Sequence, residues 1–267
     1  MTLRSIALCA FLSSAIACSE RSEAAGLTKR RVVDSSAGTV ALGIRPAKSY
    51  RPAPVSAPGA VDGTITLQGV ARDSMVPVGR DSAVCGDSAA VTETRASGSS
   101  LANALVWVDS IGVGKPLPQI RRETLTIERC RVEPRVLAVV THSTINVFSR
   151  DPVAHTLRFY REGSDDPIAE IRTVDEGQVV PSEKIASMPG IVEVRCAQHP
   201  FVRAYIAVFD HPYFAVTDDQ GAFKIDGLPA GTYNIKVWHE RLSAPMTQRV
   251  VVSASGAARL DAMVALR

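Results

Sequence analysis

The feature that most constrains the fold is a change in composition at Val61. From there to the C-terminus, short runs rich in Val, Ile, Thr and aromatic residues alternate with Gly, Pro, Asp and Ser. Many short apolar runs separated by turn-forming residues are typical of β-sandwiches and β-barrels. No stretch shows the period of a long amphipathic helix. The sequence therefore predicts an all-β fold.

The first 18 residues have the composition of an export signal. Arg4 supplies a positive charge, and residues 5–17 are uncharged and mostly apolar. This run is too short to cross a bilayer, which takes about 20 residues. Residues 15–18, Ala-Ile-Ala-Cys, resemble the lipoprotein box of bacterial envelope proteins. The resemblance implies lipidation of Cys18 and a membrane anchor, as a periplasmic or outer-membrane lipoprotein, with ordinary signal cleavage as the alternative.

Residues 19–60 predict a disordered tether. They contain four prolines between 46 and 58, many Ser and Ala residues, and a single aromatic residue, Tyr50. Such a stretch buries too little apolar surface to offset the entropy of ordering it. It also holds seven basic and three acidic residues, an excess larger than the chain's formal net charge of +3. The remainder is therefore slightly acidic, which argues against nucleic acid as a partner.

Two histidines and one cysteine stand where predicted strands end. An apolar strand pattern at 192–196 ends at Cys196, and His199 follows three positions later. Upstream, residues 149–154 form a turn that leads to His155. Two nitrogen donors and one sulfur donor from loops at one end of a sandwich make the trigonal set of a type 1 copper centre. These three residues are therefore predicted to bind one copper ion.

The same segments resemble the cupredoxin family, and the loop is most similar to the amicyanin or plastocyanin type. In that family a Pro-Gly pair precedes the strand that carries the ligand Cys, and His, Pro and Phe follow it. The matching residues here are Pro189, Gly190, Cys196, His199, Pro200 and Phe201, with Asp151 and His155 upstream. The resemblance covers about residues 120–210. It implies a Greek-key sandwich.

Three positions depart from the cupredoxin pattern. Val202 stands where the resemblance implies an axial Met, so copper would have three ligands and a raised potential. Ser149 and Thr156 replace the usual Asn residues. Loss of hydrogen bonds that orient ligands weakens a metal site by about 10–100-fold. A domain that has lost its metal is therefore the alternative.

The cysteine count leaves one thiol free. Cys9 would leave with the signal and Cys18 would carry lipid, so Cys85, Cys130 and Cys196 remain. If Cys196 binds copper, the other two are a possible disulfide, since the envelope is oxidising. A buried free thiol is the alternative for Cys196.

Residues 214–233 read as hairpins, with Gly221 available for a turn and Phe223 and Ile225 alternating inward. This segment resembles the carboxypeptidase-regulatory-like domain, a transthyretin-like β-sandwich, and the resemblance implies a spacer, adhesion or carbohydrate-contact unit. The predicted parts are a signal (1–18), a tether (19–60), a cupredoxin-like domain (61–210) and this module (211–267). The pattern leaves open which sandwich takes the strands between residues 61 and 108.

No nucleophile elbow, phosphate loop or zinc-protease motif occurs, so a catalyst is not expected. The predicted function is one-electron transfer to a redox partner protein by a lipid-anchored copper carrier, with His199 as the exit. The alternative is a metal-free envelope protein that binds or scaffolds a glycan or protein. Copper storage ranks third, because it usually employs several Cys or Met donors.

Overall fold

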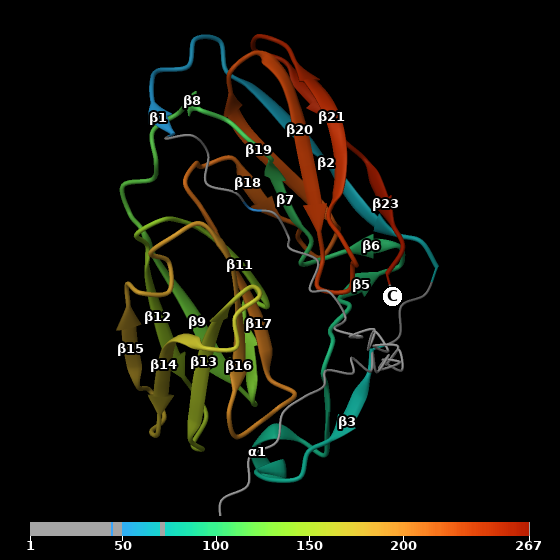
Figure 1. Cartoon of the computed structure of the whole chain (residues 1–267). Coiled ribbons are helices and arrows are strands. Elements are labelled where there is room, and N and C mark those ends of the chain that lie inside the picture. The colour runs from blue at the N-terminus through green and yellow to red at the C-terminus, as the bar shows by residue number, and fades with distance from the viewer. Residues whose placement is uncertain (1–43, 45–49, 70–72, 267) are drawn as a thin grey trace, which may run out of the picture. The chain divides into compact units, whose positions relative to one another are not determined.

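The computed structural model describes Ile44, residues 50–69 and residues 73–266. The predicted export signal, Cys18 and most of the predicted tether lie outside these residues. Within them, every regular element except one four-residue helix is a β-strand (Figure 1). The all-β prediction is confirmed. None of the described helices is long and apolar enough to cross a membrane.

The first sandwich has two facing sheets. One contains, in spatial order, β10 (Arg131–Glu133), β9 (Arg122–Glu128), β12 (Thr144–Ser149) and β15 (Val179–Ser182). The other contains β11 (Val136–Val140), β17 (Arg203–Phe209), β16 (Gly190–Cys196), β13 (His155–Arg161) and β14 (Pro167–Thr173). Two neighbouring pairs, β9–β12 and β11–β17, are parallel, because the chain changes sheet between them.

Alternation along the strands builds the core of this sandwich. In β12 every second residue is buried, and β9 likewise buries Leu125 and Ile127. From the other sheet, Phe159 and Val194 lie opposite each other and point to the same face. At about 25 cal/mol per Å² of apolar surface, this burial is the main stabilising contribution to the sandwich.

The second sandwich combines strands from both ends of the described chain. One sheet holds β18 (Phe214–Val216), β7 (Leu105–Val108), β20 (Gly231–Trp238) and β21 (Met246–Val252). The other holds β19 (Ala222–Leu228), β2 (Gly59–Leu67), β6 (Ser100–Leu101), β5 (Ala96–Ser97), β22 (Ala257–Arg259) and β23 (Ala262–Val264). As predicted, Gly221 forms the turn before β19, with φ +70°.

Strand pairing corrects the predicted domain limits. β2 pairs with β19, β22 and β23, and β7 lies between β18 and β20. The early strands therefore belong to the second sandwich and not to a domain spanning 61–210. In Figure 1 the blue β2 runs beside the red C-terminal strands. Fewer than 60 residues are too few to close a core alone, so the early strands supply Val61, Ile65 and Val106.

The predicted tether is also corrected at its C-terminal end. β1 (Arg51–Pro52) pairs with β8 (Val113–Gly114), and β2 already begins at Gly59. Tyr50 anchors this segment, because its hydroxyl donates to the Lys115 carbonyl at 2.5 Å and its ring meets that of Tyr213 edge-on. Tyr50, the one aromatic residue of the stretch, thus holds the C-terminal end of the predicted tether against the folded protein.

An insertion between β2 and β5 of the second sandwich covers one end of the first. This capping segment, residues 75–90, contains β3 (Met75–Pro77), α1 (Ser82–Cys85) and β4 (Ser88–Ala90). Val78 joins the core of the first sandwich, and Val84 packs against it. Cys85 forms a disulfide with Cys130 in the β9–β10 turn, with their Cα atoms 5.0 Å apart. This is the pairing suggested by the sequence.

The two sandwiches meet through apolar side chains and one buried ion pair. Trp107 and Trp238 of the second sandwich share a cluster with Phe209 of the first. Beside it, Arg135 and Glu240 form two hydrogen bonds, at 2.7 and 3.2 Å, and both side chains are buried. Such a paired arrangement is what makes a buried charge tolerable.

Candidate metal centre

Strand register brings His155 and Cys196 together. β13 and β16 run antiparallel, with Leu157 opposite Cys196, and both residues point into the sandwich. His155 lies two positions before Leu157 and so shares its face. The Ala197 N–H donates to the Thr156 carbonyl at 2.9 Å, which extends the pairing to the last residues before the loop.

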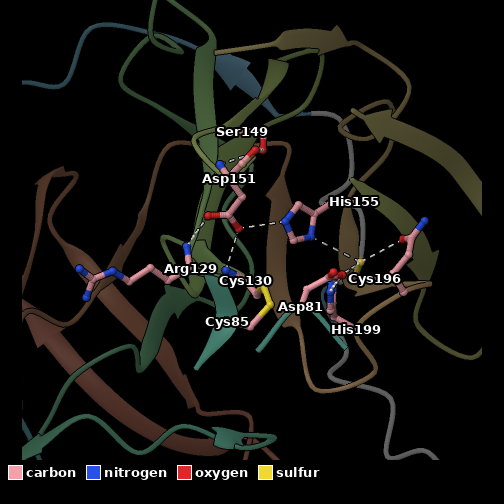
Figure 2. Close-up of a disulfide and its surroundings, with 10 residues drawn as sticks. Asp81, Cys85, Arg129, Cys130, Ser149, Asp151, His155, Cys196 and His199 are labelled. Carbon is pink, nitrogen blue, oxygen red and sulfur yellow. Dashed lines mark hydrogen bonds and ion pairs between the residues drawn. A yellow bond between two sulfur atoms is a disulfide. The ribbon is translucent and has the colours of Figure 1, made fainter. Parts of the chain in front are cut away.

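The tight loop after β16 supplies the third donor. The Val202 N–H donates to the His199 carbonyl at 2.9 Å and closes the turn. His199 then faces back toward Cys196, with its ring centroid 4.9 Å from that of His155. All three side chains are buried. The structure thus brings together the three residues predicted to bind metal (Figure 2).

The donor atoms have the separations of a three-coordinate site. Cys196 Sγ lies 3.8 Å from His155 Nδ1 and 3.6 Å from His199 Nδ1. Taking zinc bond lengths of about 2.0–2.1 Å to nitrogen and about 2.3 Å to sulfur, trigonal donors lie about 3.8 Å apart. The three donors, which all lie within 4.8 Å of one another, therefore fit a first-row metal ion.

Asp151 orients His155. The His155 Nε2–H donates to the Asp151 carboxylate at 2.9 Å, which leaves Nδ1 as the free donor toward the centre. The same carboxylate accepts the backbone N–H groups of Arg129 and Cys130 at 2.6 and 2.8 Å. Burial would raise the pKa of Asp151, but the hydrogen bonds from His155 and the two backbone groups lower it overall. Asp151 therefore stays ionised.

The surroundings of Cys196 favour its thiolate form. Burial would raise its pKa, but hydrogen bonds from His155 and His199 outweigh burial and lower the pKa to about 6. For His155, burial would lower the pKa. The hydrogen bonds to Asp151 and Cys196 outweigh burial and raise the pKa to about 9. Both shifts favour the thiolate form of Cys196 and the imidazolium form of His155 in the metal-free protein. Metal ligation needs the thiolate and replaces the imidazolium proton.

Gln198 links the two loops that carry the candidate ligands. Its Oε1 accepts the Thr156 N–H at 2.7 Å, and its Nε2 donates to the Thr156 hydroxyl at 2.8 Å. The Cys196 sulfur lies 3.4 Å from the same Oε1. Both loops are therefore joined by hydrogen bonds although Thr156 stands where the cupredoxin pattern has Asn. No role was predicted for Gln198 from the sequence.

The capping segment covers the side of the centre formed by His199. His199 is fully buried, and its Nε2 lies 3.1 Å from Asp81 in the capping segment. The predicted electron exit at His199 stays a prediction, and the imidazole that would form it is buried. A hollow of about 330 Å³ reaches the residue from outside, lined by Arg80 and Pro200 among others. Asp81 is 118 residues from His199, and no sequence pattern links the two.

The expected axial position holds no donor. Val202 is buried and packs in the apolar core. Met188, the nearest methionine upstream of the ligand strand, is 56% exposed on the surface. The remaining donors are the two histidines and the cysteine, as predicted.

The other histidines serve elsewhere. His142 is exposed. His211 and His239 are buried in packing positions, and each accepts a backbone N–H at its Nδ1, from Tyr213 and Arg241 respectively. Neither belongs to a group of metal-ligating side chains among the residues that the structure describes.

Comparison with known families gives one match. The model described as "Polysaccharide lyase family 4, domain II" matches residues 206–260, which fall mostly in the second sandwich. The resemblance of this part to the carboxypeptidase-regulatory-like domain stays a prediction. No curated protein matches the chain.

Several solved structures are similar to part of the chain. A methionine-to-alanine mutant of amicyanin with Cu(I) is 21% identical, over 32% of this chain and 79% of that one, with a TM-score of 0.27. A purple cupredoxin from Nitrosopumilus maritimus is 15% identical, over 32% and 97%, also with a TM-score of 0.27. A copper-containing nitrite reductase from Thermus scotoductus SA-01 is 16% identical, over 45% of this chain and 26% of that one, with a TM-score of 0.30. The case for a metal centre rests on the geometry of this chain.

Proposed function

We propose that the first sandwich binds one copper ion through His155, Cys196 and His199 and carries one electron. The observation that carries this proposal is the convergence of two imidazole nitrogens and one sulfur at trigonal separations. Two histidines and a thiolate without a strong fourth ligand are the donor set of electron-transfer copper sites. Copper bound there would alternate between Cu(II) and Cu(I).

The residues around the donors support electron transfer over catalysis. Asp151 and Gln198 hold the ligand loops in place, so the geometry can stay the same in both oxidation states. Val202 and Phe201 make the surroundings apolar, which favours the lower charge of Cu(I) and raises the potential. All three donors are buried, which shields a bound copper ion from solvent.

Electrons would pass through the hollow beside His199. Pro200 is exposed at its rim, and Phe201 packs against the imidazole with ring centroids 5.7 Å apart. A redox partner protein would dock there through a small, transient interface. Lipid anchoring at Cys18 in a bacterial periplasm or outer membrane, and carbohydrate contact by the second sandwich, complete the proposal.

Titration of the metal-free protein with Cu(II) tests this function. The expected result is a stoichiometric visible absorption band from thiolate-to-copper charge transfer, absent from Cys196→Ser. Ser143→Ala, which alters a buried hydroxyl bonded to the Val140 carbonyl away from the ligand residues, is the matched control and should keep the band. Absence of the band, with Cys196 reacting as an ordinary thiol, would leave the metal-free binding or scaffolding function.

A further inference from the structure

The disulfide lies against the candidate metal centre. The sulfur atoms of Cys85 and Cys130 and a ring nitrogen of His199 all lie within 4.8 Å of one another. Figure 2 shows the disulfide beside Asp81 and His199, with the Cys130 backbone bonded to the carboxylate that holds His155. Joined to each other, the two sulfurs are poor ligands. As thiolates, they would be the strongest soft donors in this part of the protein.

We propose that reduction of the Cys85–Cys130 disulfide creates a second site, specific for Cu(I), beside the first. This inference extends the proposed copper function but uses different sulfur donors. Thiolates select Cu(I) over harder cations, and Cu(I) is satisfied by two or three ligands. Cys85 and Cys130 supply two, and His199 can add a nitrogen when it is not bound to the first ion.

The disulfide can be reached from outside. A hollow of about 490 Å³ is lined by both cysteines and by Arg129 and Arg131. Both arginines are exposed, and positive charge beside a cysteine favours its thiolate. Cys85 is partly exposed while Cys130 is buried, so Cys85 is the sulfur open to attack.

The reduction balances with a dithiol reductant. A thiolate of the reductant attacks Cys85 Sγ, and the Cys130 thiolate leaves. The second thiol of the reductant then attacks the mixed disulfide, releases the Cys85 thiolate and closes the reductant's own disulfide. Two electrons have passed to the protein, and Cu(I) binds the resulting thiolates without any further change of oxidation state.

Other contacts hold the two sulfurs in place after reduction. The capping segment keeps the β3–β4 pairing and the packing of Val78 and Val84. The Cys130 N–H remains bonded to Asp151. The two thiols therefore stay adjacent in the folded protein. The copper capacity of the protein would then depend on the thiol–disulfide balance of its compartment.

Counting Cu(I) under anaerobic conditions tests this inference, with a coloured Cu(I) chelator as competitor. The disulfide is opened with a water-soluble phosphine, which is removed by anaerobic desalting before Cu(I) is added because phosphines also bind Cu(I). We expect one Cu(I) per chain before reduction and two after it. Cys85→Ser/Cys130→Ser should bind one in both conditions, and Cys196→Ser should bind none before reduction and one after it.

The variants separate this inference from the proposed function. If reduced Cys196→Ser binds one Cu(I) while the oxidised wild type binds none, the second site stands and the first fails. If the reduced wild type still binds one Cu(I) and reduced Cys196→Ser binds no Cu(I), the second site is refuted and the first stands. Loss of the β-sheet circular dichroism on reduction, before copper is added, would also contradict the proposal, because the site requires the folded protein.

Discussion

The two sandwiches bury polar side chains in different ways. In the second, the Thr217 hydroxyl donates to the Leu101 carbonyl at 2.7 Å and accepts the Ala104 N–H at 2.9 Å. These bonds satisfy the buried Thr217 hydroxyl, whereas Nε2 of His239 in the same sandwich is buried without a hydrogen-bond partner among the described residues. In the first, the two histidines and Cys196 gather at one end, where β12 and β16 finish and β13 begins, and their donor atoms lie close to one another.

The two arrangements differ in their cost to stability and in what they can bind. A polar group bonded within the strands costs little stability, whereas a cluster of donors facing one point costs stability unless an ion or a proton network compensates for it. The proposed copper function is therefore assigned to the first sandwich. The second supports it through the shared apolar cluster and the Arg135–Glu240 pair.

Breaking the contact between the sandwiches should have the largest effect on stability. Arg135→Ala leaves the buried Glu240 carboxylate without its partner, so we expect the free energy of unfolding to fall by about 3–5 kcal/mol. Urea denaturation measures this. Arg158→Ala, which breaks the exposed pair with Glu170, should leave the midpoint nearly unchanged. Equal effects of both variants would refute the assigned role of the buried pair.

Removing the carboxylate behind His155 should affect the metal centre instead. Asp151→Ala frees the imidazole to rotate, and we expect copper affinity to fall by about 10–100-fold. Competition with a chelator of known affinity measures the loss. Asp165→Ala, an exposed carboxylate elsewhere on the first sandwich, is the control. Unchanged affinity in Asp151→Ala would show that Asp151 does not position the ligand.

Cutting the tie between the ligand loops should have a smaller effect. Gln198→Leu removes both bonds to Thr156, and we expect an affinity loss of about 10-fold, at the low end for such supporting bonds. Gln178→Leu is a matched control, because Gln178 also accepts a backbone N–H, from Val174, outside the centre. An equal loss in both variants would point to general loosening of the sandwich.

The mildest test is spectroscopic and leaves the native protein unchanged. Because the histidines lower the pKa of Cys196 to about 6, its thiolate should be present above that pH and lost as the pH falls through it. The ultraviolet thiolate absorbance of the metal-free protein, minus that of Cys196→Ser, gives the midpoint. A midpoint near about 8.5, the value of a free thiol, would mean that the histidines do not stabilise the thiolate.

The convergence of the three candidate ligands was predictable because their geometry is local. A strand that ends in Cys196 with His199 in the following turn carries its spacing in the sequence. The register of one neighbouring strand then places His155 beside them. The all-β class was predictable for the same reason, since alternation and turn residues are local signals.

What the sequence left open depends on contacts between distant segments. β2 and β7 read as ordinary short strands, and alternation does not specify which sheet a strand joins. The contact between Asp81 and His199 depends on the path of an insertion that precedes the whole first sandwich. The role of Gln198 needs the position of Thr156 on a neighbouring strand, which only the folded register supplies.

X-ray absorption at the copper edge of the loaded protein, with the disulfide intact, tests the central claim most directly. The account predicts one short copper–sulfur distance and two copper–nitrogen distances, with the sulfur lost in Cys196→Ser. A copper ion with only nitrogen and oxygen neighbours, or a spectrum that Cys196→Ser leaves unchanged, would contradict the assignment of His155, Cys196 and His199 as its ligands.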